Sequence, residues 1–147
     1  MNLIEHKKAR FDYEILEQFE AGIELLGFEV KSLRAHHGTL EGAHVIVRGN
    51  EAYIVGMTIP PYQAANTPKD YDPAHTRRLL LTKKEISALA GFEGKKGLTI
   101  VPISVYSKAR KLKMAVAVAR GRKKFDKREV LKTRTAKRDI ERTLKNQ

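Results

Sequence analysis

The sequence contains no cysteine, and this absence excludes disulfide scaffolds, thiolate metal sites and cysteine nucleophiles. Tryptophan is also missing, and no stretch approaches the ~18 consecutive apolar residues of a membrane-spanning helix. The first residues, Met1 to Phe11, lack the apolar segment of a signal peptide. The sequence therefore predicts a cytoplasmic protein that does not engage a membrane and whose fold depends on side-chain packing alone.

Acidic residues are scarce relative to basic ones, with 17 Asp and Glu against 29 Lys and Arg, for a formal charge of +12 over 147 residues. The length suits one domain. Residues 121–147 carry 11 basic and 4 acidic residues, a balance of +7, whereas residues 1–120 carry 18 and 13, a balance of +5. This distribution predicts a polyanionic partner, nucleic acid before acidic lipid, and a domain over residues 1–120 followed by a basic tail over 121–147.

Four segments have the β-branched composition of strands, namely His44–Arg48, Ala52–Met57, Leu98–Tyr106 and Lys111–Arg120. The first two flank a Gly/Asn turn at residues 49–51, and the last two flank a turn near residues 107–109, so each pair predicts a hairpin. The last strand alternates Met114, Val116 and Val118 with three alanines. Large side chains on one face and small ones on the other are typical of a curved barrel wall.

Residues 13–26 fit two interpretations. Ile15, Phe19 and Ile23 match one face of a helix, whereas the aromatic and β-branched residues match a strand. Gly22 favours a strand that is bent or bulged at that residue. The sequence leaves both possibilities open.

Two helices are predicted elsewhere. One covers Glu29–Ala35 and stops near Gly38; the other covers Thr82–Ala90. For the second, Thr82 is the expected N-cap, Glu85 completes a capping box and Gly91 is the expected stop. Residues 60–77 are expected to form a long polar loop, and long loops in compact domains are usually functional or mobile. Short strands and interspersed helices without a regular alternation predict an α+β, mainly β, small antiparallel barrel with two or three short helices.

The basic tail differs from the domain in kind. Thr133, Ala136, Ile140 and Leu144 form only a thin apolar stripe, so the tail is expected to be disordered when free and to become helical on a phosphate surface. Its first part embeds an aromatic ring in cations, which suits stacking on an unpaired base while the neighbours hold phosphates. The expected contacts in the tail are Arg122, Lys123, Lys124, Phe125, Asp126, Lys127, Arg128, Arg134, Lys137 and Arg138.

Catalytic and metal motifs are incomplete. Gly94-Lys95-Lys96 lacks both the earlier glycine and the Ser or Thr of a phosphate loop. His36 and His37 lack a metal-ligand spacing, and Asp70 with Asp72 supplies at best half of a cation site. The sequence predicts a protein that is not an enzyme and needs no metal or cofactor.

The segment Glu20–Arg34, with the sequence EAGIELLGFEVKSLR, resembles a block of the SsrA-binding protein (SmpB) family. Further blocks resemble the family in the same order along the chain: Ala9–Tyr13, Ile59–Tyr62, Asp72–Pro73 with Arg77–Leu81, Val101–Ile103 with Tyr106, and Gly121–Glu129. The resemblance covers about residues 7–129, and the ordered combination is far more specific than any single block.

The resemblance implies an OB-like barrel that binds the tRNA-like domain of transfer-messenger RNA and delivers it to stalled ribosomes for trans-translation, or ribosome rescue. Tyr13, Glu20 and Leu80 fall on family positions associated with holding that RNA, while His6 and Thr82 replace the usual Asn and the usual His or Asn. With the short basic clusters added, the expected RNA contacts are His6, Lys7, Arg10, Tyr13, Glu20, Arg77, Arg78, Leu80 and Thr82.

The expected mechanism divides the work between a monomeric barrel and its tail. The barrel is expected to grip the elbow and acceptor part of the tRNA-like RNA and to fill the space where a true tRNA has its anticodon arm. The tail is expected to enter the part of the message channel, next to the small-subunit decoding centre, that is vacant when a messenger ends early. Phe125 is expected to stack near the decoding centre. The alternative from composition is a structural ribosomal or rRNA-binding protein, which would share a basic barrel and tail.

Overall fold

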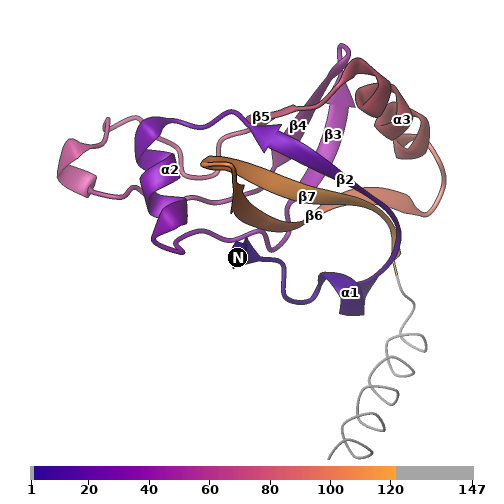
Figure 1. Cartoon of the computed structure of the whole chain (residues 1–147), viewed down its shortest axis with the longest axis horizontal. Helices are drawn as coiled ribbons and strands as arrows, with labels where there is room; N and C mark the ends of the chain where they lie inside the picture. Colours follow the sequence, from indigo (N-terminus) through magenta and orange to yellow (C-terminus); the bar gives the residue numbers. More distant parts are fainter. Residues whose placement is uncertain (1, 122–147) are drawn as a thin grey trace, which may run out of the picture.

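The computed structural model describes residues 2–121 (Figure 1). The predictions for the tail from Arg122 onward lie outside the described residues. Seven strands form one antiparallel sheet in the order β1-β6-β7-β2-β5-β4-β3. The strands are β1 (Asn2–Glu5), β2 (Tyr13–Ile23), β3 (His44–Arg48), β4 (Glu51–Val55), β5 (Arg77–Leu80), β6 (Leu98–Lys108) and β7 (Lys111–Gly121). The helices are α1 (Ala9–Asp12), α2 (Gly27–Arg34) and α3 (Lys83–Glu93), with a 3-10 turn at Ala64–Asn66.

The sheet curls on itself, so that Cα atoms of β3 come within 8 Å of those of β6. Within residues 2–121 the hydrogen-bonded ladder stays open there, and β1 and β3 form the two edges. Helix α3 covers this seam, since it contacts both β3 and β6, and α2 lies at the other end of the molecule beside the β6–β7 turn (Figure 1). The α+β, mainly β, OB-like prediction is confirmed, with an incompletely closed barrel.

The core lies inside the curl. Met114, Val116 and Val118 of β7 are fully buried in it, as the size alternation predicted. The alternate alanines lie on the other face of the strand and outside this core, although Ala117 and Ala119 are also fully buried. Helices contribute Leu33 from α2 and Leu89 from α3, both with no exposed surface. Each such aliphatic side chain stabilises the fold by roughly 1.5–3 kcal/mol relative to remaining in water.

Residues 13–23 form a strand, which resolves the ambiguity left by the sequence. Strand β2 pairs with β7 from Tyr13 opposite Gly121 to Gly22 opposite Lys113, and its last residue, Ile23, pairs with Leu79 of β5. The register shift falls between Ile15 and Glu17, so the bulge lies there and not at Gly22, the residue for which the sequence predicted a bend or a bulge. Apolar residues that recur at every fourth position are compatible with a helix or a strand. Pairing with the long strand β7 therefore decides the conformation of this segment.

Both predicted hairpins are present. The first turns at Gly49 and Asn50, whose φ values of 57° and 64° match the type I′ turn that such residues favour. The second turns at Ala109 and Arg110, one residue later than the centre of the expected turn, and these residues also have positive φ values, of 51° and 67°.

Both predicted helices exist with shifted ends. Helix α3 begins with the expected cap, because Thr82 Oγ accepts the Glu85 amide at 3.2 Å and the Glu85 carboxylate accepts the Thr82 amide at 3.0 Å. The expected stop at Gly91 is wrong, since the helix continues to Glu93. That last residue gives the reason: Glu93 Oε2 accepts the Val47 amide of β3 at 2.6 Å, and Oε1 pairs with Arg48. A contact across the fold therefore outweighs the low helix propensity of glycine.

Candidate nucleic-acid interface

A groove of about 980 Å³ runs between β5, the β3–β4 turn and the start of α3, and it reaches the outer face of β2 and β7. Its charged residues are balanced, with carboxylates from Glu20, Glu51 and Glu85 and cations from Arg78, Lys83 and Lys113. With balanced charges, the groove is not simply a phosphate-binding site. It offers hydrogen-bond acceptors and donors around an apolar wall, which suits the edges and faces of unpaired bases.

Leu80 supplies apolar surface in this groove. Its side chain is 47% exposed, while the preceding Leu79 is fully buried, because alternate residues of β5 face opposite sides of the sheet. Gly22 of β2 lies opposite Leu80, and a Cβ added at Gly22 would be 3.1 Å from the Leu80 Cβ. The glycine therefore permits the close approach of Leu80, a role different from the bulge that the sequence suggested.

Arg78 and Thr82 also line the groove, but both already have partners. Arg78 Nε lies 3.0 Å from a Glu24 carboxylate oxygen, and its Nη1 lies 3.6 Å from Glu51. The Thr82 hydroxyl donates to Glu85 Oε1 at 2.9 Å in addition to capping α3. Arg78 is thus a cation that an incoming phosphate could recruit from two exposed carboxylates, whereas Thr82 primarily fixes the N-terminus of α3.

Glu20 holds two side chains of the β6–β7 hairpin. The Tyr106 hydroxyl donates to Glu20 Oε2 at 2.6 Å, and Lys108 Nζ lies 3.3 Å from both carboxylate oxygens. The Tyr106 hydrogen bond and, next, the Lys108 cation hold the pKa of Glu20 below its usual value. Burial and the neighbouring Glu20 raise the pKa of Tyr106 to about 12. At neutral pH the cluster therefore pairs an ionised Glu20 carboxylate with a neutral Tyr106 phenol.

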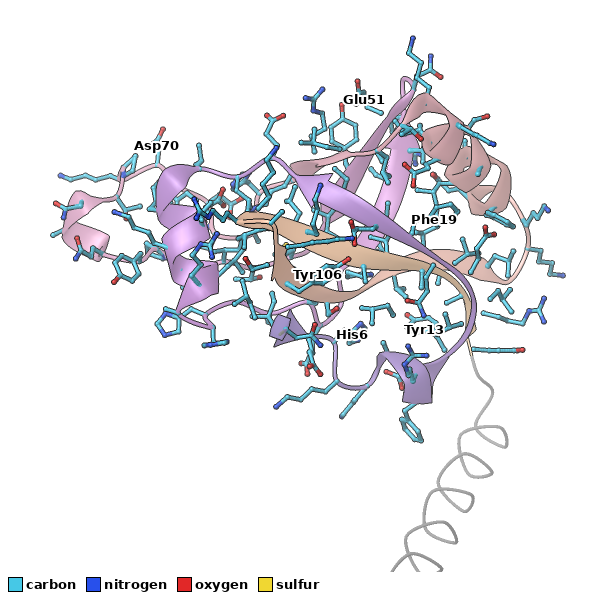
Figure 2. All side chains as sticks on the ribbon, viewed as in Figure 1. His6, Tyr13, Phe19, Glu51, Asp70 and Tyr106 are labelled. Carbon is cyan, nitrogen blue, oxygen red and sulfur yellow. The ribbon has the colours of Figure 1, made fainter. Side chains whose placement is uncertain are left out.

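His6, Lys7, Arg10 and Tyr13 lie together at the other end of β2, around the one-turn helix α1 (Figure 2). Lys7 and Arg10 are exposed, and His6 is half-buried with its backbone amide donating to the Ile103 carbonyl at 2.8 Å. Tyr13 pairs with Gly121, the last described residue. The structure thus divides the predicted contacts into a groove group and an N-terminal group.

Arg77 belongs to neither group. Its side chain has no exposed surface, so the expectation of an exposed Arg77–Arg78 RNA contact is corrected for Arg77. Its five N–H donors are all used: Nε and Nη2 donate to Glu29 Oε2 at 2.8 and 2.6 Å, Nη1 donates to the carbonyls of Met57 and His75, and Nη2 also donates to the Pro73 carbonyl. This side chain holds the long β4–β5 loop against α2.

Glu29 is the centre of that buried network. Besides Arg77, its carboxylate accepts the Leu26 amide at 2.8 Å and lies 2.9 Å from both the Tyr71 hydroxyl and His75 Nε2. Burial alone would raise the pKa of Glu29, but the Leu26 amide and Arg77 outweigh it and keep the pKa below its ordinary value. Burial and the adjacent carboxylate raise the pKa of Tyr71 to about 12.

Several residues of this region were absent from the expected RNA contacts. They are Tyr106 and Lys108, which hold Glu20 beside the groove, and Glu51, Lys83 and Lys113, which line the groove. The signal that could have found Tyr106 and Lys113 is strand register, since the two are cross-strand partners and Lys113 also lies opposite Gly22. That register depends on the conformation of residues 13–26, which the sequence did not settle.

Within residues 2–121 no group of three or more His, Cys, Asp or Glu side chains is arranged to hold a metal ion. None of the helices described has the length and apolar character required to cross a membrane.

Comparison with known proteins gives one consistent answer. A family model described as SmpB protein matches residues 3–146. An SsrA-binding protein of Gloeothece citriformis is 45% identical over 143 residues, which are 97% of this chain and 92% of the relative. An SsrA-binding protein of Clostridium kluyveri is 46% identical over 143 residues, which are 97% of this chain and 90% of the relative. A chain of the solved structure described as "tmRNA-SmpB: a journey to the center of the bacterial ribosome" has a TM-score of 0.69 and 40% identity, with 86% of this chain and 92% of that chain covered.

Proposed function

The chain belongs to the SmpB family of SsrA-binding proteins, and from this premise we propose that it binds the tRNA-like domain of transfer-messenger RNA and delivers that RNA to stalled ribosomes. The observation that carries the proposal is the groove that brings Glu20, Arg78 and Leu80 onto one outer face of the sheet. Relatives that are named for binding SsrA share nearly the whole length of the chain, including this face. The proposal assigns no reaction to the protein.

In the groove, unpaired bases are the expected ligand. Leu80 offers an apolar surface against which an unstacked base can pack, and the Glu20 carboxylate can accept hydrogen bonds from a base edge or hold the cations that contact the backbone. Arg78 and Lys113 are available for flanking phosphates. We expect this part of the interface to recognise the shape of a loop in the RNA rather than a long sequence.

The N-terminal group is the second expected contact. Tyr13 lies nine residue steps along β2 from Gly22, a separation of up to about 30 Å in an extended strand, and Lys7 and Arg10 lie near Tyr13 around α1. A folded RNA is large enough to reach both regions at once. This spacing supports a tRNA-like partner.

The tail supplies the ribosome-binding part of the proposal. Residues 122–147 would enter the vacant message channel and fold into a helix as their cations meet RNA phosphates, with Phe125 stacking near the decoding centre. Lys127, Arg128, Arg134, Lys137 and Arg138 would hold the tail in the channel. An intact messenger would occupy the same channel, so selectivity for broken messages would follow from exclusion.

Truncation after Gly121 tests this division of labour. We expect the truncated protein to bind the isolated tRNA-like RNA with an affinity close to that of the full chain, because every described contact is retained, and to lose peptide tagging on stalled ribosomes. Filter binding and an in vitro tagging assay measure the two properties. Loss of binding to the isolated RNA would contradict the proposal, and stoichiometric retention of the full chain on ribosomes washed in high salt would favour a structural ribosomal protein.

A further inference from the structure

The turn between β6 and β7 contains two residues that rarely adopt the backbone conformation found there. Ala109 and Arg110 have φ values of 51° and 67°, in the left-handed region where Asn and Gly are preferred. The first hairpin of the same sheet meets this requirement with Gly49 and Asn50. Backbone preference therefore does not account for the arginine at 110, and strain of this kind is typical of positions where the side chain has a use.

A side chain from another element holds the turn in place. Arg34, the last residue of α2, donates from Nη2 to the Arg110 carbonyl at 3.0 Å and from Nη1 to the Ser107 hydroxyl at 3.5 Å. The tip of the hairpin is thus fixed relative to α2 while the Arg110 side chain remains exposed. A fixed tip presents its charges without the entropic cost of ordering a mobile loop.

Four cations gather at this tip, which we name the hairpin-tip cluster: Arg34 of α2, and Lys108, Arg110 and Lys111 of the hairpin. Lys108 lies opposite Lys111 across the turn. Among residues 2–121 the one ion pair to this cluster joins Lys108 to Glu20. The remaining positive charge faces solvent, which favours an anionic partner.

The hairpin-tip cluster is continuous with the groove. Lys113 lies two residues beyond Lys111 on β7 and lines the groove, and Glu20 lines the groove while pairing with Lys108. Tyr106 lies near this end of the hairpin (Figure 2), and Gly121 lies at the opposite end of β7 (Figure 1), ten residue steps from Lys111 or up to about 33 Å along the strand. A nucleic acid in the groove can therefore continue over the tip.

We propose that the hairpin-tip cluster binds the phosphate backbone of the same RNA that occupies the groove, so that Arg110 and Lys111 contact a helical segment next to the recognised loop. This inference rests on the proposed function and extends it to residues outside the groove and the tail. The contacts are to phosphate, so they strengthen binding without reading sequence.

The variant Arg110→Gly tests the proposal in the full-length protein. Glycine adopts a φ of 67° without strain, so the fold should be at least as stable, and thermal unfolding verifies this. The matched control is Lys96→Ala, which also removes one positive charge but lies in the α3–β6 connection. We expect Arg110→Gly to weaken binding of the isolated tRNA-like RNA roughly threefold to tenfold and to reduce the slope of log K against log salt by about 0.7 to 0.9, as for one lost phosphate contact. Lys96→Ala should change both by much less.

Other outcomes overturn the inference. Equal losses in the two variants would indicate a general effect of net charge. Unchanged binding of isolated RNA by Arg110→Gly, whether or not ribosome binding weakens, would show that the tip does not contact the groove-bound RNA. Failure of the unmodified protein to bind the tRNA-like RNA would overturn the proposed function as well, and the two failures are therefore distinguishable.

Discussion

Glu29 and Glu20 each accept a hydrogen bond from a tyrosine and pair with a cation, but in opposite surroundings. Glu29 meets Tyr71 and Arg77 where neither charged side chain has exposed surface. Glu20 meets Tyr106 and Lys108 on the outer face, where the carboxylate side chain is 39% exposed and the lysine 63%. The same chemical groups thus hold a loop in one place and remain open to a partner in the other, because burial decides whether water or a ligand can replace their contacts.

The largest expected effect comes from breaking the buried cluster. Replacement of Arg77 by Met leaves the Glu29 carboxylate buried without its cation, and this should lower the free energy of unfolding by about 3–5 kcal/mol. Arg78→Met is the matched control, since the neighbouring arginine is exposed and should cost about 0–1 kcal/mol. Urea denaturation at pH 7 measures both. Similar losses of stability in the two variants would mean that burial does not determine how much each arginine stabilises the fold.

A smaller effect is expected from neutralising the exposed cluster. Glu20→Gln should change the urea midpoint little, because the carboxylate is partly exposed and its contacts are screened by water, and should weaken binding of the tRNA-like RNA roughly tenfold, the scale of one good base contact. Glu41→Gln is the control, since this residue is exposed and lies outside the groove lining. A change in the midpoint without a change in RNA affinity would assign Glu20 a structural role.

The smallest expected effect is a difference between Glu29 and Glu20 in how the free energy of unfolding depends on pH. The pKa of Glu29 is lower in the folded protein than its ordinary value of 4.5, so the unfolded chain binds the proton more readily. Stability contributed by Glu29 is therefore complete above that value and is lost as the pH falls below it. We expect Glu29→Gln, which keeps an acceptor oxygen, to flatten the decline of unfolding free energy between pH 5 and pH 3 more than Glu20→Gln does. Equal slopes in the two variants would contradict this ranking.

Local signals in the sequence predicted the hairpins and the start of α3. The turn at Gly49 and Asn50 needs two positive φ values that these residues adopt readily, and the Thr82–Glu85 capping box is complete within four residues. Both features depend on neighbours along the chain. This is why composition and spacing were sufficient for them.

The burial of Arg77 could not be predicted in the same way. Strand β5 has only four residues, with Leu79 inward and Leu80 outward, and the same alternation places Arg77 inward and Arg78 outward. Two adjacent arginines indicate an exposed basic pair unless the strand is recognised first. The partner Glu29 lies 48 residues away, so no local pattern revealed the ion pair.

The contacts of Glu20 were hidden for a related reason. Tyr106 and Lys108 lie 86 and 88 residues from it, and they meet it only because β6, β7 and β2 are neighbours in one sheet. The family resemblance identified Glu20 as a contact position, but the neighbouring side chains follow from strand register. The sequence thus identified Glu20 as one residue of the groove, but the side chains around it could be identified only from the three-dimensional structure.

The carboxylate of Glu93 has a consequence for association between copies of the chain. Strand β3 is an edge of the sheet, and its Val47 amide is already bound by Glu93 Oε2 at 2.6 Å, with Arg48 held by the other oxygen. An incoming strand would have to displace this ion-paired acceptor before it could add to the sheet. The end of α3 therefore makes β3 a poor template for intermolecular strand addition and amyloid-like growth.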